Sequence, residues 1–364
     1  MKHFIVGPVE MYPSTKEVYK DGITYFRTDE YSEIANNSLK KLASLIGNEL
    51  ENSLIYLTAS GTAAMEAVVE NCVNKSDKAL VINGGTFGKR FCELLKYHDI
   101  PYEAINLAWN ETLTYEHLKP YENEDFTTMF VNLHETSTGQ LYDIKMLSGF
   151  CKKKNMYLIV DAISTFMADD YNMSENEIDV TIISSQKGLS LSAGMSMVSF
   201  SERMLDKVKN NTEVASCYFD FKDYLRNIER GQTPYTPCVG IMYELQDMLN
   251  LIEKSGGKDA WLSKIKQKAQ YFRKKASELG FKIPDYPLSD MLTPLVFEDV
   301  SAYEVIQHLK NEYRIFVNPC GGAMADKMMR VSHIGNTTIE DIDELLEKML
   351  LSIEAVKKQE ALVW

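Results

Sequence analysis

Asp179-Val-Thr-Ile-Ile-Ser-Ser-Gln-Lys-Gly-Leu-Ser-Leu-Ser-Ala-Gly194 contains an apolar run that ends in small polar residues and then in one lysine, Lys187. The β-branched residues of the run predict a buried strand. An amine held at the edge of a buried sheet loses hydration, which lowers the pKa of a lysine and makes it a nucleophile. Lys187 could therefore form a Schiff base, although a surface lysine that closes a strand would look the same.

Apolar runs of the same kind recur on both sides of this stretch, between about residues 54 and 200. They lie at 54–57, 79–82, 128–133, 157–160, 180–183 and 197–200. Segments with helix-forming composition and apolar spacing separate them at 62–74, 89–97 and 145–154. This alternation predicts an α/β fold in which βα units surround a mostly parallel sheet. Such sheets bind ligands at the carboxyl ends of their strands.

The pattern changes after about residue 255. A long charged helix is predicted over 258–279, strands over 293–297 and 313–317, and a closing helix near 338–357. With 364 residues, the chain is long enough for one large and one smaller domain. We predict an N-terminal arm (1–16), a large ligand-binding domain (17–255) and a small α+β domain (256–364), with the arm reaching across to the small domain or to a partner subunit.

The composition narrows the class of ligand. A formal net charge of -13 makes a nucleic-acid or anionic-membrane partner unfavourable, so a small metabolite is expected. The six cysteines form no CxxC pair and no metal-like cluster with histidine, which predicts reduced thiols and no metal site. No signal-like or membrane-length apolar segment is visible, so the expected location is cytoplasmic.

Two motifs after predicted strands could contact a cofactor. In 58–67, small residues open a helix, and its free N–H groups, with the hydroxyls of Ser60 and Thr62, can bind a phosphate. The same residues also suit an ordinary helix N-cap. In 83–88, glycines let the backbone approach a ligand, and Phe87 offers a flat face to an aromatic ring. A glycine-rich turn beside a core phenylalanine is the other interpretation.

Polar groups follow two further strands. In 132–139 the hydroxyl of Thr136 could donate to a phenolate oxygen, whereas we interpret His134 and Glu135 as structural groups. Asp161 follows the apolar run 157–160, and because burying an unpaired carboxylate is costly, it should have a cationic partner. It could also be a helix N-cap.

Asp161 and Lys187 are 187 − 161 = 26 residues apart, which is one βα excursion, so both can face one crevice. A phosphate cradle, a ring-stacking aromatic, a phenolate donor, a pyridinium partner and a Schiff-base lysine together describe one ligand, pyridoxal 5′-phosphate (PLP). A carboxylate keeps the ring nitrogen protonated, so that the ring takes up electrons when a substrate Cα–H bond breaks. The lysine would then relay the proton.

The chain resembles the class V aminotransferases of PLP fold type I, and is similar to alanine–glyoxylate and serine–pyruvate aminotransferases over nearly its full length. The stretches that carry the resemblance are 7–10 (GPVE), 26–31 (FRTDEY), 60–62 (SGT), 134–139 (HETSTG), 160–164 (VDAIS), 185–187 (SQK), 233–237 (TPYTP) and 329–335 (MRVSHIG). The resemblance implies a seven-stranded, mostly parallel sheet in the large domain.

The resemblance also assigns roles to residues. Lys187 would hold the cofactor as a Schiff base, Asp161 would bind the pyridine nitrogen, and Arg330 would receive the substrate carboxylate, a bidentate task suited to guanidinium. The other implied cofactor contacts are the ring-packing Phe87 and Ile163, the phenolate donor Thr136, the phosphate ligands Ser60, Gly61, Thr62 and Gln186, and Tyr235 and Thr236 contributed across the interface of a homodimer with shared active sites.

The main functional hypothesis is ping-pong transfer of an amino group from a small donor, such as alanine or serine, to a 2-oxo acid, such as pyruvate or glyoxylate. A 2-aminoethylphosphonate–pyruvate transaminase is the alternative within the family. A cysteine desulfurase could use Cys320, but such enzymes usually have histidine where Gln186 stands. A PLP-binding protein without turnover is the third possibility. Arg27 could bind a second anionic group or form a structural salt bridge.

Overall fold

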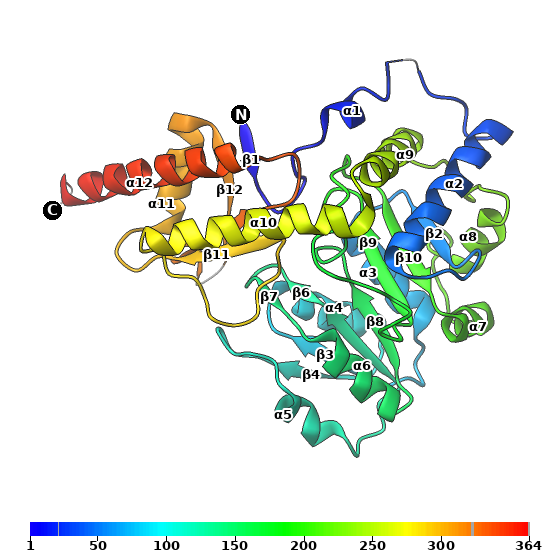
Figure 1. Cartoon of the computed structure of the whole chain (residues 1–364). Helices are drawn as coiled ribbons and strands as arrows, with labels where there is room; N and C mark the ends of the chain where they lie inside the picture. Colours follow the sequence, from blue (N-terminus) through cyan, green and yellow to red (C-terminus); the bar gives the residue numbers. More distant parts are fainter. Residues whose placement is uncertain (21, 322–323, 363–364) are drawn as a thin grey trace.

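The computed structural model describes residues 1–20, 22–321 and 324–362 of the chain. Its largest element is a seven-stranded sheet with the strand order β2-β10-β9-β8-β5-β3-β4 (Figure 1). The strands are β2 (Leu54–Leu57), β3 (Ala79–Asn83), β4 (Tyr102–Asn106), β5 (Thr128–Asn132), β8 (Tyr157–Asp161), β9 (Val180–Ser184) and β10 (Ser196–Phe200). Only β10 runs antiparallel to its neighbours, so the predicted α/β fold with a mostly parallel sheet is confirmed.

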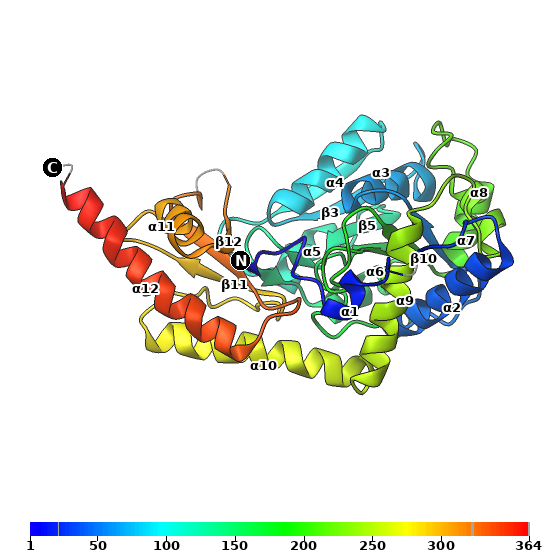
Figure 2. The ribbon, with the colours of Figure 1, turned by 90° about the horizontal axis from the view of Figure 1, so that it is seen from above.

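Helices cover both faces of this sheet. Figure 2 shows α3 (Gly61–Cys72) and α4 (Thr86–Tyr97) on one side of the strands and α9 (Val239–Lys254) on the other. The remaining elements of this part are α2 (Asp29–Ile46), α5 (Tyr115–Leu118), the 3₁₀ turn η1 (Lys119–Tyr121), the hairpin strands β6 (His134–Glu135) and β7 (Gln140–Leu141), α6 (Ile144–Lys153), α7 (Glu202–Asn210) and α8 (Phe221–Ile228).

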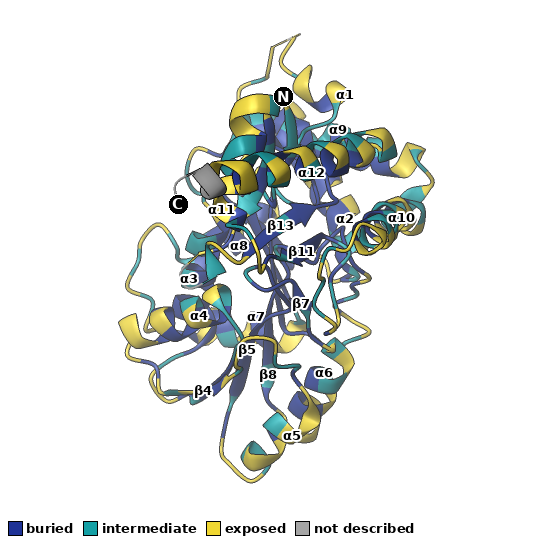
Figure 3. Cartoon of the chain, turned by 90° about the vertical axis from the view of Figure 1, so that its left-hand side faces the viewer, coloured by how far each residue is buried: buried dark blue, intermediate teal, exposed yellow. Residues whose placement is uncertain are grey.

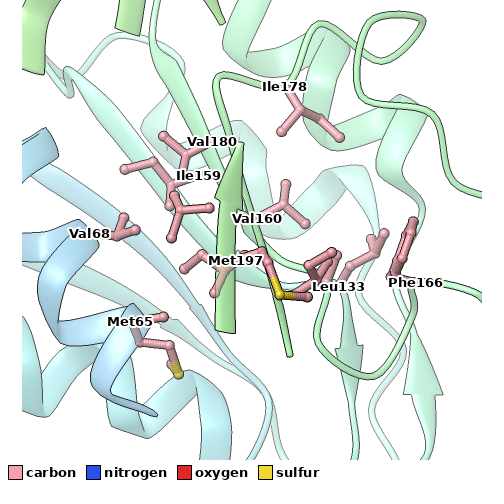
Figure 4. Packing of buried hydrophobic residues seen from close by; sticks show 14 of the residues in the cluster. Met65, Val68, Leu133, Ile159, Val160, Phe166, Ile178, Val180 and Met197 are labelled. Atoms are coloured by element: carbon pink, nitrogen blue, oxygen red, sulfur yellow. The ribbon is translucent and has the colours of Figure 1, made fainter. Parts of the chain in front are cut away.

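The core lies between the sheet and its helices. Met65 and Val68 of α3 face buried side chains of the central strands, among them Met197 of β10 (Figure 4). Strands β5 and β8 are buried along their whole described length except Tyr157, whereas the outer faces of the helices are exposed (Figure 3). Burial on both faces explains why these strands are continuous apolar runs rather than alternating ones.

A second sheet of four strands forms the other part of the molecule, with the order β1-β12-β13-β11. Its strands are β1 (Lys2–Phe4), β11 (Leu292–Val296), β12 (Ile315–Pro319) and β13 (Met328–Ser332), and its helical elements are α10 (Gly257–Glu278), α11 (Ala302–His308), the π-helical turn η2 (Leu309–Tyr313) and α12 (Ile339–Leu362). This sheet has its own apolar cluster, which includes Phe4, Phe272 and Leu295. The domain boundaries after residues 16 and 255 stay a prediction.

The first residues of the chain connect the two sheets. Strand β1 pairs in parallel with β12, and the Val9 N–H then donates to the Gln186 carbonyl at 3.3 Å, next to Lys187. Helix α1 (Pro13–Lys16) follows and packs against α9, where the Thr15 hydroxyl donates to the Asp247 carboxylate at 2.9 Å. From here on, the arm means only residues 5–12 of the predicted N-terminal arm, the stretch between β1 and α1.

Among the described residues, no helix combines the length and the apolar character that a bilayer span requires.

Candidate active site

Lys187 lies three residues beyond β9, at the carboxyl end of the strand, and its side chain is partly buried. Loss of hydration lowers its pKa to about 8, the nearby charge of Arg330 acts in the same direction, and Asp161 opposes both. The arm covers the side chain closely, because a Cβ atom built on Gly7 would lie 2.8 Å from Lys187 Cδ. The amine is therefore a covered, weakly basic group.

Asp161 is the last residue of β8, the strand next to β9, and only 6% of its surface is exposed. One carboxylate oxygen accepts the Ile163 N–H at 2.9 Å. Burial raises the pKa of Asp161 to about 7, even though that hydrogen bond and the charge of Lys187 favour the ionised form. Within the described chain no Lys, Arg or His is close enough to form an ion pair with Asp161, although the charge of Lys187 acts on it from a greater distance. A buried carboxylate without an ion-pair partner suits a cationic ligand.

The N-terminus of α3 lies beside this pair. Ser60 is the N-cap residue, and its hydroxyl accepts the Ala63 N–H at 3.3 Å. A Cβ atom on Gly61 would be 2.5 Å from Ile163 Cδ1, so glycine is what lets Ile163 pack there. The Thr62 hydroxyl accepts from Arg90 Nη1 at 3.2 Å. Sequence reasoning missed Arg90, a cation on α4 beside the predicted anion cradle, because its approach to Thr62 shows only in the fold.

Gln186 forms one hydrogen bond through its side chain and one through its main chain. The side-chain carbonyl oxygen accepts the Ser184 hydroxyl at 2.8 Å, while the main-chain carbonyl accepts the Val9 N–H of the arm. Gln186 therefore holds the arm beside Lys187.

Glu135 orders the start of α4, where Phe87 lies. Its buried carboxylate accepts the N–H groups of Phe87 at 3.2 Å and of Gly88 at 3.1 Å, and thereby caps the helix. Asn132 Nδ2 donates to the same carboxylate at 2.9 Å. Phe87 itself is partly buried. Glu135 thus has a structural place in this arrangement.

Thr136 and His134 are both linked to the loop after Asp161. The Thr136 hydroxyl donates to the Ser164 hydroxyl at 2.9 Å, and His134 Nδ1 donates to the Ser164 carbonyl at 3.3 Å. Complete burial lowers the pKa of His134 to about 3, so the ring is neutral and unsuited to donate a proton near neutral pH.

Arg330 lies on β13 of the small sheet and reaches the loop between the hairpin strands β6 and β7. Nη1 donates to the Thr136 carbonyl at 2.8 Å and Nη2 to the Pro319 carbonyl at 2.6 Å. Nε is buried without a partner in the described chain. Since each Nη carries two hydrogens, the guanidinium is held by two carbonyls and still has donors for a carboxylate.

Cys320 follows β12 and is buried, with Sγ 3.7 Å from the Ser137 carbonyl. Burial raises the pKa of this thiol, although Arg330 opposes the shift. A thiol that resists ionisation is a poor nucleophile, so the environment does not favour sulfur transfer.

Three predicted positions lie apart from this group. The Tyr235 ring stacks on Tyr218 at 5.1 Å between centroids, and Thr236 is exposed. Neither side chain bonds to Lys187 or Asp161 within the described residues. Arg27 donates to the Thr233 carbonyl at 2.9 Å and to the Gln232 side chain at 3.1 Å. Both partners are neutral oxygens, and among the described residues Arg27 forms no salt bridge, so a second anionic ligand for Arg27 stays a prediction.

The structure thus brings together Lys187, Asp161, the Gly61–Ile163 contact and, through Thr136, Arg330. In addition, the described residues contain no group of three or more His, Cys, Asp or Glu side chains placed to hold a metal ion.

Comparison with known proteins identifies the family of the chain. The family model described as aminotransferase class-V matches residues 21–345. An uncharacterised aminotransferase of Methanocaldococcus jannaschii is 27% identical over 337 residues, which is 91% of this chain and 87% of the relative. The serine–glyoxylate aminotransferase of Hyphomicrobium methylovorum is 24% identical and covers 91% of this chain and 84% of its own.

Solved structures support the same fold. The alanine–glyoxylate aminotransferase of Nostoc sp. superposes with a TM-score of 0.90 at 24% identity, covering 96% of this chain and 94% of its own. Because the family model spans most of the sequence, including every residue of the site described above except those of the arm, the chain belongs to the class V aminotransferase family.

Proposed function

We propose that the protein is a PLP-dependent aminotransferase that moves the amino group of a small donor, such as alanine or serine, to a 2-oxo acid such as glyoxylate or pyruvate. Family membership supports amino transfer. The observation that carries the proposal is the pair formed by Lys187 and Asp161, an amine of lowered pKa near a buried carboxylate that forms no ion pair within the described chain.

The residues present fit PLP. Asp161 can bind a protonated ring nitrogen, and Phe87 and Ile163 can pack against the ring. Ser60, Gly61 and Thr62 offer the first turn of α3 to the phosphate, with Gln186 nearby. When bound, PLP supplies a ring that accepts the electron pair left by the substrate Cα–H bond. Tyr235 and Thr236 would complete the phosphate site of a partner subunit in a homodimer.

Lys187 is suited both to hold the cofactor covalently and to move the Cα proton. With a pKa near 8, about one amine in ten is neutral at pH 7, whereas an ordinary lysine is almost entirely charged. The arm over its side chain limits access of water to the amine. With the cofactor bound, the Lys187 amine would accept the proton from the substrate Cα and hold it for return.

Arg330 orients the substrate. Its two carbonyl partners fix the plane of the guanidinium, and its remaining donors can hold a carboxylate in bidentate fashion. Two relatives are named for glyoxylate, with serine or alanine as the other substrate, which supports a 2-oxo acid as acceptor. A phosphonate could occupy the same guanidinium, so 2-aminoethylphosphonate stays in the test.

The test is a donor screen on the purified protein loaded with PLP. L-Alanine, L-serine, L-aspartate or 2-aminoethylphosphonate is added alone, and the absorbance band of the lysine-bound cofactor is followed. At least one donor should bleach the band, and glyoxylate or pyruvate should then restore it. The Arg330→Gln variant is the control, and it should bleach only at much higher donor concentration.

Two outcomes contradict the proposal. A band that persists with every donor would rule out amino transfer. Release of sulfide from L-cysteine that disappears in a Cys320→Ala variant would instead identify a desulfurase.

A further inference from the structure

A second buried carboxylate, Asp169, lies outside the candidate active site, eight residues beyond Asp161, and is 8% exposed. Both of its oxygens accept hydrogen bonds from one distant segment. Oδ2 accepts the Ser289 hydroxyl at 2.5 Å and Oδ1 accepts the Asp290 N–H at 2.7 Å, across more than a hundred residues of sequence. Asp169, in the connection between β8 and β9 of the large sheet, is therefore joined to the segment 286–290, which leads into β11 of the small sheet.

Arg273 of α10 holds the same segment from the other side. It donates to Asp290 Oδ1 at 3.1 Å, to the Ser289 carbonyl, and to the Thr293 hydroxyl at 3.0 Å. Thr293 in turn contacts His333 Nε2 at 2.8 Å. Arg273 and Asp290 are thus the charged groups that face Asp169, with His333 beyond them. Burial raises the pKa of Asp169 to about 7, while its Ser289 and Asp290 hydrogen bonds oppose that shift.

The segment that Asp169 holds is also fastened to the loop that positions Arg330. The Tyr286 hydroxyl donates to the Thr138 carbonyl at 2.6 Å, and the Leu141 N–H donates to the Pro287 carbonyl at 2.8 Å. Two residues before Thr138, the Thr136 carbonyl accepts from Arg330.

Strand pairing completes the path from Asp169 to Arg330. Asp290 is followed by β11, and β11 pairs with β13 so that Pro294 lies opposite Arg330. A shift of segment 286–290 would therefore move β13 relative to Thr136, and with it the guanidinium. Asp169 itself bonds to neither Lys187 nor Asp161 in the described chain, so such a shift would leave the proton relay in place.

We propose that Asp169 is a positioning residue for the substrate carboxylate: by fixing segment 286–290 it sets the small sheet, and hence Arg330, against the Thr136 loop. The inference rests on the proposed function, which gives Arg330 its substrate. It adds a determinant of substrate affinity from a position that does not contact substrate.

The experiment compares Asp169→Ala and Asp169→Asn in the PLP-loaded enzyme, with the exposed neighbour Asp170→Asn as the matched control. In Asp169→Ala, KM for the donor and for the 2-oxo acid should each rise about tenfold, with kcat within about twofold of wild type, as expected when uniform substrate binding is lost. Asp169→Asn keeps an acceptor for the Asp290 N–H and should rescue most of the effect. Asp170→Asn should match wild type.

A double-mutant cycle separates positioning from simple stabilisation. In an Arg330→Gln background, Asp169→Ala should raise KM less than twofold, because the group through which it acts is gone. Hydrogen exchange gives a readout without substrate: amides of 286–296 should exchange faster in Asp169→Ala, and those of β8 and β9 should not.

Three results would contradict the proposed role of Asp169. Equal tenfold effects in both backgrounds, a fall in kcat at unchanged KM, or a lower melting temperature with unchanged KM would each overturn the role of Asp169. Absence of turnover in the wild-type enzyme with every donor would overturn the proposed function as well, whereas wild-type turnover with an unaltered KM in Asp169→Ala overturns this inference alone.

Discussion

At the scale of single residues, the same burial acts on Lys187 and Asp161 in opposite directions. It lowers the pKa of the amine to about 8 and raises that of the carboxyl group to about 7. Each group is thereby moved toward its neutral form, since a charge loses hydration in a covered site. A ligand that brings a positive ring nitrogen restores the charge on Asp161, so cofactor binding and ionisation of this carboxyl group are coupled.

Replacing Lys187 by alanine should leave the fold intact and remove turnover. Loss of the proton relay alone is worth about 10²–10⁴-fold in rate. The rate at which the PLP-reconstituted variant forms the 2-oxo acid product of the amino donor measures the loss, and far-UV circular dichroism checks the fold. Residual activity within tenfold of wild type would show that another group moves the proton.

Asp161→Asn should stabilise the cofactor-free protein at alkaline pH. Because the pKa of Asp161 is raised from 3.8 to about 7 in the folded state, its stabilising contribution is full below about pH 4 and is lost as pH rises through 7. At pH 8 the variant should gain about 2–4 kcal/mol in free energy of unfolding, and near pH 4 almost nothing. Urea unfolding at the two pH values measures the difference. Equal free energies of unfolding for the variant and the wild type at pH 8 would contradict the raised pKa of Asp161. The affinity of the variant for PLP should be lower than that of the wild type.

Sequence reasoning placed Asp161 and Lys187 together because one βα excursion separates them. It could not find Arg90, Asp169 or the lack of an ion-pair partner for Asp161 among the described residues. Those features depend on which side chains meet across the fold, and the partners of Asp169 lie more than a hundred residues away.

At the scale of elements, the arm depends on a residue without a side chain. Gly7 has φ +138°, and a Cβ atom there would be 2.8 Å from Lys187 Cδ and 3.1 Å from the Gln186 carbonyl oxygen. Both the backbone conformation and the close approach favour glycine. The contact between the arm and Lys187 is therefore a property of this one position.

Gly7→Ala should displace the arm from Lys187. The backbone strain and the close contact of the new Cβ atom should together lower the free energy of unfolding by about 1–3 kcal/mol. Water should reach the Lys187 amine more easily, and kcat/KM should fall for that reason. Gly280→Ala is the matched control, since Gly280 has φ +84° but open space around it. Thermal unfolding and steady-state kinetics with the amino donor, measured for both variants, test the prediction. The prediction fails if the two variants lose kcat/KM to the same extent.

The central strands and their crossover helices were predictable because parallel strands that are buried on both faces consist of continuous apolar residues. Strand β4 was not identified individually, because at the sheet edge Tyr102-Glu-Ala-Ile-Asn106 is only partly buried and carries polar residues. The strand predicted at 313–317 begins at Ile315 instead, since Leu309–Tyr313 forms a π-helical turn and Arg314 adopts φ +55°. Local propensity gave no sign of that turn.

At the scale of the whole molecule, Tyr235 and Thr236 are predicted cofactor contacts whose side chains form no hydrogen bond with Lys187 or Asp161 of the same described chain. If they serve a partner's phosphate site, the protein should elute as a homodimer of twice 41.5 kDa, which light scattering measures. Mixed dimers of Lys187→Ala and Tyr235→Ala subunits give a sharper test, because one of their two sites would again contain both side chains.

Activity that returns on mixing two weakly active variants would establish sharing. If Tyr235 acts within its own subunit, mixing should restore nothing, because each subunit still lacks one of the two groups.

The pairing of β1 with β12 sets an order of events during synthesis. Lys2 lies opposite Ile315, so the first strand has no partner until about 315 residues have left the ribosome. The seven strands of the large sheet end at Phe200 and can assemble much earlier, as domains generally do during translation. The pairing of β1 with β12 is therefore among the last contacts to form, and in the proposed enzyme we expect Lys187 of the newly made large sheet to be open to PLP until that pairing anchors the arm.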